Sequence, residues 1–202
     1  MSEAPNTGDE ELVVLARGGD LDAFNRLVDR YQGSVYSLCV RLLGNREAAE
    51  DAAQEAFLSA YRALDRFHGG SFRSWVLRIA ANEAKDELRR RRRKDGATSL
   101  EAIFDRQESP VEIPDPSEGA EVIVERHDFG RALEIALGDL PFEQRQAVLL
   151  VDVYEFAYEE VARLTKASVG TVKSRIHRGR ERLRQAMIAR PELFEGLVRP
   201  EE

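Results

Sequence analysis

The residues best suited to chemistry lie between Tyr158 and Leu183, where a short apolar-patterned segment precedes one rich in Lys and Arg. Apolar residues of the second segment recur at the spacing of one helical stripe: Val169, Val172, Ile176 and Leu183. The polar and basic side chains off that stripe are candidates for contact with DNA: Thr171, Lys173, Ser174, Arg175, His177, Arg178 and Arg180. A helix that packs by one side can lay such a face into a major groove. The spacing therefore predicts a helix-turn-helix that binds duplex DNA.

The turn of this motif has an unusual composition. Ser168 is a natural N-cap for the second helix. Lys166 stands where Gly commonly supplies a positive φ, and Thr165 stands where an apolar residue would help packing. An ordinary amphipathic helix pair with a solvated basic face is the alternative interpretation.

A second basic segment, residues 67–93, interleaves aromatic rings with cations. Its aromatic residues are Phe67, Phe72 and Trp75, and Arg78 is among its basic ones. Aromatic faces beside positive charge suit unstacked, single-stranded bases, and the loop at residues 68–70 could enclose a flipped base. The alternative is that Phe72, Trp75 and Ile79 simply pack in the protein interior.

A third feature is acidic: Glu47, Asp51 and Glu55 recur every four residues on one helix face, with Gln54 beside them. Stacked like charges lower stability, so a partner surface or a metal is indicated. A carboxylate-bridged dimetal site would need Glu-x-x-His pairs on facing helices, and the sequence offers no such pair. We therefore expect protein docking here, and we expect no metal and no cofactor; a plain solvated face is the alternative.

Signals of catalysis are missing from the sequence. It has no GxxxxGK[ST] phosphate-binding loop, no GxGxxG and no HExxH. Its three His are dispersed, and we expect the single Cys39 to be buried, so no nucleophile–base pair is evident. The chain is not expected to be an enzyme.

Charge is distributed unevenly along the 202 residues, whose formal net charge is -7. Residues 66–94 carry +7 and residues 158–190 carry +6, whereas residues 95–127 carry -7. The local field, not the total, governs contact with phosphate, so the acidic total does not exclude nucleic acid. One Cys cannot form an internal disulfide, and neither a signal peptide nor a membrane-spanning stretch is evident, which predicts a cytoplasmic protein.

The composition and periodicity predict an all-α fold of two small helical domains joined by an extended acidic linker. We expect a disordered N-terminus at 1–8, a first domain at 9–94, the linker at 95–127, a second domain at 128–190 and a tail at 191–202. The helices are expected near residues 9–17, 20–43, 46–66, 71–93, 128–138 and 142–153, followed by the helix-turn-helix.

Three motifs, in their order, resemble the bacterial RNA polymerase sigma factors of the extracytoplasmic-function (ECF, group IV) class. They are DAAQEAFLSAYRAL (51–64), SFRSWVLRIAANEAKDELRR (71–90) and YEEVARLTKASVGTVKSRIHRGRERL (158–183). The resemblance extends over about residues 9–188.

For the first domain, the resemblance implies a sigma-2 module. The face with Asp51, Gln54 and Glu55 would dock on the coiled coil of the polymerase β′ clamp. The segment from residue 67 to 92 would recognise and open the -10 element. Asn82 matches a position that contacts the flipped base, and the other candidates for -10 contact are Phe67, Phe72, Trp75 and Arg78.

For the second domain, the resemblance implies a sigma-4 module whose recognition helix reads the -35 element. Base edges would face Lys173, Ser174, His177 and Arg178, and phosphates would be held by Thr171, Arg175 and Arg180. The implied partners are core RNA polymerase, through its β′ clamp and β flap, and promoter DNA, and an anti-sigma factor is a further expected partner. The acidic linker would thread toward the polymerase active-site channel.

Two rival hypotheses belong to other classes. A conventional helix-turn-helix transcriptional regulator needs only residues 128–190, and it leaves the aromatic–basic segment and the acidic helix unexplained. A helical enzyme with a carboxylate metal site would bind metal when purified.

Overall fold

The computed structural model describes residues 8–94, 130 and 132–189, and throughout this described part the regular structure is helical, without strands. The chain divides into two compact units, Met1–Leu100 and Glu101–Glu202. Both findings confirm the prediction of an all-α protein with two helical domains. The predicted acidic linker, residues 95–127, and the predicted C-terminal tail lie outside the described residues.

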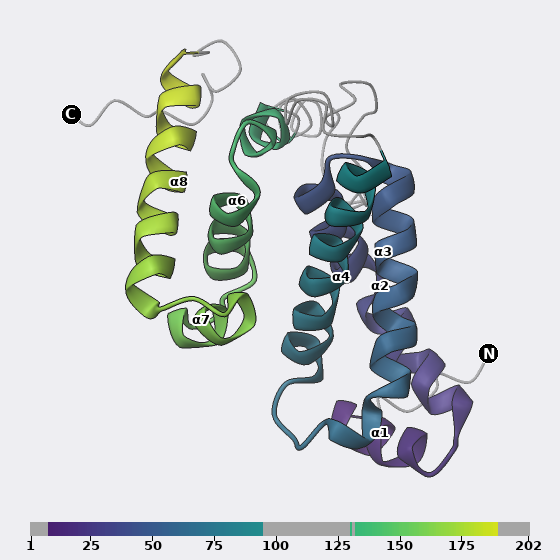
Figure 1. The fold of residues 1–202 in the computed structure, drawn as a ribbon. Helices are drawn as coiled ribbons and strands as arrows, with labels where there is room; N and C mark the ends of the chain where they lie inside the picture. The colour runs from purple at the N-terminus through teal and green to yellow at the C-terminus, as the bar shows by residue number, and fades with distance from the viewer. Residues whose placement is uncertain (1–7, 95–129, 131, 190–202) are drawn as a thin grey trace, which may run out of the picture. The chain divides into compact units, whose positions relative to one another are not determined.

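The first unit is built on three mutually packed helices, α2 (Leu21–Leu43), α3 (Arg46–Arg62) and α4 (Phe72–Lys94), with α1 (Asp9–Arg17) packed on α2 (Figure 1). Large apolar side chains of α2 and α4 fill its interior. In α3 the buried residues are all alanines, at positions 48, 49, 52, 53, 56 and 60. Small side chains let neighbouring helices approach closely, so α3 lies against both α2 and α4.

Capping residues define both ends of α2 and the start of α3. The Asp20 carboxylate accepts a hydrogen bond from Ala23 N at 3.1 Å. Gly44 ends α2 in the left-handed region at φ 67°, where glycine carries no steric cost. Asn45 then caps α3 by accepting from Ala48 N at 2.8 Å. The helix boundaries predicted at Asp20 and Gly44 are confirmed.

The predicted helix at residues 46–66 is too long by one turn. α3 ends at Arg62, and a 3₁₀ turn, η1 (Leu64–Arg66), follows it. This turn buries Leu64 to 3% exposure, and Arg17 Nε donates to the Leu64 carbonyl at 3.1 Å. Anchorage of Leu64 by α1 redirects the chain, and no local sequence pattern encodes it.

The second unit consists of a helix that includes residues 132–138, then α6 (Phe142–Val148), the π-helical segment η2 (Leu149–Val153), α7 (Tyr158–Thr165) and α8 (Val169–Ala189). Both α6 and α7 pack on α8 (Figure 1). The helix predicted at 142–153 is thus α-helical only in its first part. Pro141 directly precedes α6, as predicted.

α6 and α8 cross at Gly179, a residue buried on the packed side of α8. A Cβ at this position would lie 2.6 Å from Val148 Cγ2 and 3.4 Å from both Leu140 Cδ2 and the Gln144 carbonyl oxygen. Glycine is therefore required for the close approach of the two helices, because any side chain would push α6 away.

Arg145 is a buried cation that ties the start of α6 to the preceding helix. It is 3% exposed, and its NH2 donates to the carbonyls of Gly138 at 2.7 Å and Leu140 at 2.9 Å. Burial lowers the pKa of its guanidinium to about 10. These bonds stabilise carbonyl groups that the end of the 132–138 helix would otherwise leave unsatisfied.

Cys39 is fully buried in α2, as the sequence predicts. Burial raises the pKa of its thiol to about 12, and the negative charge of Glu83 acts in the same direction. Among the described helices, none is long and apolar enough to span a membrane.

Candidate nucleic-acid interfaces and docking surface

The turn between α7 and α8 has helix-turn-helix geometry without a glycine. Lys166 adopts the left-handed conformation at φ 52° and ψ 42°. The Thr165 hydroxyl donates to the Val161 carbonyl at 2.8 Å, which satisfies this polar group within its own helix. Ser168 Oγ accepts from Thr171 N at 3.0 Å, so the predicted N-cap of the second helix is confirmed.

α8 is divided into a packed side and a solvent-facing side. Val172 and Ile176 are buried, as predicted, whereas Val169 and Leu183 are half-buried at the ends of the stripe. Arg175 is half-buried, and the other predicted DNA-contacting residues are exposed: Thr171, Lys173, Ser174, His177, Arg178 and Arg180. This arrangement presents cations and hydrogen-bonding groups together on one exposed surface, which a major groove can accept.

Hydrogen bonds within the motif already order some of these side chains. Thr171 Oγ1 and Ser168 Oγ lie 2.8 Å apart, and Ser174 Oγ donates to the Gly170 carbonyl at 3.0 Å. Lys173 Nζ lies 5.9 Å from the centre of the Tyr158 ring, a cation–π contact between α8 and α7.

Arg180 forms a bidentate ion pair with Asp152 of η2. Sequence reasoning did not single out Asp152. Arg180 Nε donates to Asp152 Oδ2 at 3.0 Å, and NH2 donates to Oδ1 at 2.5 Å. The hydrogen bond to Asp152 raises the pKa of Arg180 above its ordinary value. The two residues are 28 positions apart, so no local spacing signals the pair.

The aromatic residues at the start of α4 form a packed cluster. Ring centroids lie 5.2 Å apart for Phe67 and Trp75, 5.5 Å for Phe72 and Trp75, and 5.9 Å for Phe67 and Phe72. Phe67 is 4% exposed and Phe72 only 1%, whereas Trp75 is half-buried. Burial of this degree leaves no exposed ring face on Phe67 or Phe72 in this conformation. Contact of these two side chains with a base stays a prediction. The rings pack against one another, and Phe72 is buried as the alternative anticipated, whereas Trp75 is only half-buried.

The loop beside this cluster is exposed, and its conformation requires two glycines. Gly69 and Gly70 have φ of 93° and 85°, in a region that side-chain-bearing residues rarely adopt. Ser71 Oγ accepts from Ser74 N at 3.1 Å, which caps α4. Further along α4, Asn82 is exposed and Arg78 half-buried. The structure thus places Asn82 where a ligand can reach it.

The basic end of α4 is organised by one carboxylate. Glu87 is 6% exposed, and it pairs with Arg90 NH1 through Oε2 and with Arg91 Nε through Oε1, each at 2.9 Å. Two of the five consecutive arginines at residues 89–93 are therefore held close to the helix.

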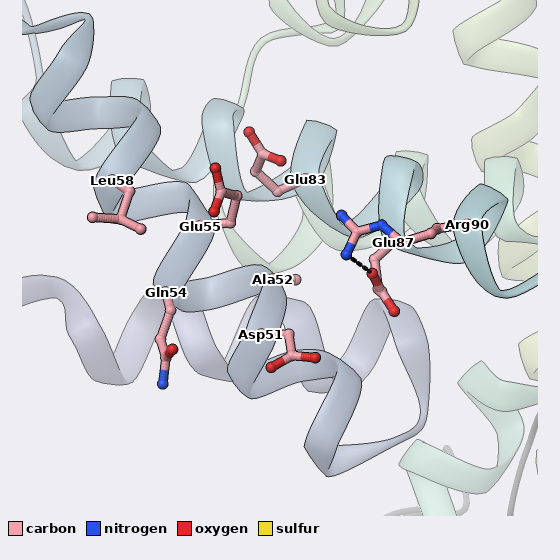
Figure 2. A pocket seen from close by; sticks show the side chains of 8 residues that line it. All are labelled: Asp51, Ala52, Gln54, Glu55, Leu58, Glu83, Glu87 and Arg90. Carbon is pink, nitrogen blue, oxygen red and sulfur yellow. Dashed lines mark ion pairs between the residues drawn. The ribbon is translucent and has the colours of Figure 1, made fainter.

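The predicted docking residues lie on α3 beside α4. Asp51 and Gln54 are exposed, and Glu55 is half-buried. Figure 2 shows the pocket that they line with Ala52 and Leu58 of α3 and with Glu83, Glu87 and Arg90 of α4. The Ser59 hydroxyl donates to Glu83 Oε1 at 2.9 Å and joins the two helices.

Leu58 is a member of this surface that sequence reasoning missed. Its side chain is 49% exposed although it is large and apolar. The available signal was its position seven residues after Asp51, on the same helix face. A single exposed leucine is common on protein surfaces, so Leu58 extends this candidate face without identifying its partner. Among the described residues, no group of three or more His, Cys, Asp or Glu side chains is arranged to hold a metal.

Comparison with known proteins identifies the family. Sigma-70 region 2 matches residues 27–94, and sigma-70 region 4 matches residues 131–183. The ECF RNA polymerase sigma-E factor of Escherichia coli K12 is 38% identical over 178 residues, which is 86% of this chain and 91% of the relative. The chain belongs to the sigma-70 family, in its ECF class. As an ECF sigma factor it is an RNA polymerase sigma subunit that directs transcription initiation.

Two further similarities agree with this assignment. ECF RNA polymerase sigma factor SigE of Mycolicibacterium smegmatis is 38% identical over 165 residues, covering 81% of this chain and 61% of that relative. Among solved structures, the sigma factor RpoE in complex with the anti-sigma factor NepR from Bartonella quintana matches with a TM-score of 0.60 and 25% identity. That match covers 81% of this chain and 96% of the RpoE chain.

Proposed function

We propose that this ECF sigma factor gives core RNA polymerase its promoter specificity through two DNA-reading modules and one docking face. The observation that carries the proposal is the exposed surface of α8, where a capped helix packed by Val172 and Ile176 presents its basic side chains to solvent. In this role α8 reads the -35 element. Lys173, Ser174, His177 and Arg178 face base edges, while Thr171, Arg175 and Arg180 contact phosphates.

The first unit recognises and opens the -10 element. Asn82 and Arg78 on α4, together with the exposed loop at residues 68–71, provide the contact surface for an unstacked base. Phe67 and Phe72 pack on Trp75 and thereby hold its ring in place beside this surface. Trp75 is half-buried and remains the aromatic candidate for direct contact with DNA.

Docking on core polymerase uses the α3 face. The carboxylates of Asp51 and Glu55, with Gln54, lie along the same face as the exposed Leu58, so negative charge and an apolar side chain adjoin on it (Figure 2). The β′ clamp coiled coil is the proposed partner of this face, and the β flap is the proposed partner of the second unit. RpoE is structurally similar to this chain and was solved with an anti-sigma factor, which supports an anti-sigma partner here too.

The proposal assigns no catalytic role and no cofactor to this chain, which acts in the cytoplasm, where polymerase and nucleoid are found. Reconstitution with core polymerase and a randomised promoter library tests it. Run-off transcription should select promoters with two separate sequence elements, and the chain alone should bind these promoters weakly. Tight promoter binding by the purified chain, with no gain from core polymerase, would contradict the proposal.

A further inference from the structure

One flank of α8 is tied to the two elements that precede it. Arg180 is held by Asp152 of η2 through two hydrogen bonds, and Lys173, two helical turns before Arg180, lies over the ring of Tyr158 at the start of α7. Residues seven apart share a helix face, so both contacts lie along the same flank. Tyr158 also contributes to the raised pKa of Arg180. This organised flank contains two residues, Asp152 and Tyr158, that have no part in the function proposed above.

The geometry of the ion pair leaves part of Arg180 available. Asp152 occupies the edge of the guanidinium formed by Nε and NH2, at 3.0 and 2.5 Å. NH1 takes no part in the two hydrogen bonds to Asp152, and the Arg180 side chain remains 55% exposed. A guanidinium can donate to a second oxyanion through that edge. The Asp152 side chain, at 28% exposure, is the more enclosed of the two.

Placement of Asp152 depends on the π-helical segment. η2 continues α6 from Leu149 to Val153. A π turn inserts one additional residue, so it rotates the residues that follow relative to a continuous α-helix, and such segments are frequent at functional sites. In this structure Asp152 lies within η2, and its carboxylate reaches Arg180 of α8.

A carboxylate beside a DNA-binding helix has two opposing effects. Its negative charge repels the phosphate backbone, which lowers affinity. Its hydrogen bonds, however, order a long arginine side chain before DNA arrives, and this reduces the entropy lost on binding. The two effects have opposite signs, so replacement of Asp152 shows which of them dominates.

We propose that Asp152 is a positioning residue that presents Arg180 to a phosphate of the promoter duplex, so that this acidic side chain strengthens DNA binding. The proposal deepens the function proposed for α8 and rests on it. The ligand chemistry is a backbone phosphodiester, and Asp152 itself makes no contact with DNA.

The test uses holoenzyme reconstituted from the full chain and core polymerase, with a duplex promoter fragment chosen by run-off selection. Asp152→Asn should weaken promoter binding by about two- to tenfold, the range expected when one long side chain loses its preorganisation. The measurement is the dissociation constant by fluorescence anisotropy at several salt concentrations.

Glu181→Gln is the matched control. Glu181 also forms a bidentate ion pair with an arginine of α8, Arg184, at 3.0 and 2.8 Å, but both partners belong to the same helix. The charge change equals that of Asp152→Asn, so repulsion alone predicts tighter binding for both variants. We expect unchanged or tighter binding for Glu181→Gln and weaker binding for Asp152→Asn.

An Arg180→Ala background separates positioning from a general structural role. Without Arg180, removal of the Asp152 charge should no longer weaken binding. A loss of the same size in this background would mean that Asp152 stabilises the unit, and it would overturn the proposal. Asp152→Asn holoenzyme that binds as tightly as the wild type, or more tightly, would also overturn it. If wild-type holoenzyme selects no promoter, the function proposed for α8 fails first, and this inference fails with it.

Discussion

At the scale of single residues, α8 separates folding from recognition. Its buried positions, Val172, Ile176 and Gly179, hold the helix in the unit. Its exposed positions, among them Lys173 and Arg178, lie outside this buried packing, although Lys173 contacts the Tyr158 ring of α7. We expect the fold to tolerate their replacement.

Replacement of either exposed cation tests base recognition. Lys173→Ala or Arg178→Ala should cost about 1–3 kcal/mol of discrimination between promoter and altered -35 sequences, because a side chain that donates to base edges distinguishes one base from another. Competition binding of holoenzyme with promoters mutated one base at a time measures the effect. An equal loss on every sequence would identify the side chain as a phosphate contact.

Replacement of Gly179 tests the helix crossing. Alanine favours a helix over glycine by about 1 kcal/mol, but here its Cβ would lie 2.6 Å from Val148 Cγ2. Gly179→Ala should therefore destabilise the second unit by about 1–3 kcal/mol, as expected for an overpacked interior. Urea denaturation measures the change.

Gly170→Ala in the same helix is the control for this prediction. The Cβ there would meet only Ser168 Oγ, at an ordinary 3.7 Å. Alanine should therefore stabilise α8 by up to about 1 kcal/mol. Destabilisation of equal size in both variants would mean that the crossing at Gly179 is not the cause.

At the scale of elements, the sequence is informative where a helix end depends on its own residues. The caps at Asp20, Gly44 and Ser168 were predictable because each side chain or backbone angle acts on neighbours within four residues. Lys166 adopts the left-handed turn conformation in place of the usual glycine, an outcome that the sequence alone did not establish.

Elements whose form depends on distant contacts could not be predicted in the same way. α3 stops early because Leu64 is anchored by Arg17, which lies 47 positions away in the sequence. The burial of Phe72 depends on its contacts with Phe67, Trp75 and Tyr31, and the last of these belongs to another helix. The Asp152–Arg180 pair needs both the π segment and the packing of α8, and neither leaves a recognisable spacing.

The α3 face yields a prediction at this scale. Asp51→Arg combined with Glu55→Arg should weaken binding to core polymerase by at least tenfold, since like charges juxtaposed at an interface are strongly unfavourable. Neither side chain is buried, so thermal unfolding should stay close to that of the wild type. Glu10→Arg with Asp29→Arg, exposed positions on α1 and α2, makes the same charge change elsewhere and should leave affinity nearly unchanged. Core affinity unaltered by the α3 variant would exclude this docking face.

At the scale of the whole molecule, the family assignment requires both units. Sigma-70 regions match the two units separately, at residues 27–94 and 131–183. A conventional helix-turn-helix regulator would use only the second match. The first unit, with its proposed docking face and its basic α4, has no role under that hypothesis.

Deletion of residues 1–94 distinguishes the two hypotheses. The sigma-factor function predicts that the remaining fragment loses promoter-directed transcription and binds a -35 duplex only weakly, because the docking face and the -10 contacts are removed. Run-off transcription and anisotropy with the same promoter measure both effects. Specific, high-affinity binding by the fragment alone would favour the conventional regulator, provided that circular dichroism shows the fragment to be folded.

The enclosed thiol of Cys39 has a practical consequence for such measurements. The sequence contains one cysteine, and a protonated, buried thiol is a poor nucleophile. Maleimide dyes should therefore leave the native chain unlabelled and react selectively with a cysteine introduced at an exposed position in either unit. The chain thus needs no cysteine-free background for single-molecule fluorescence, in which the separation of its two units could be followed as they engage polymerase and DNA.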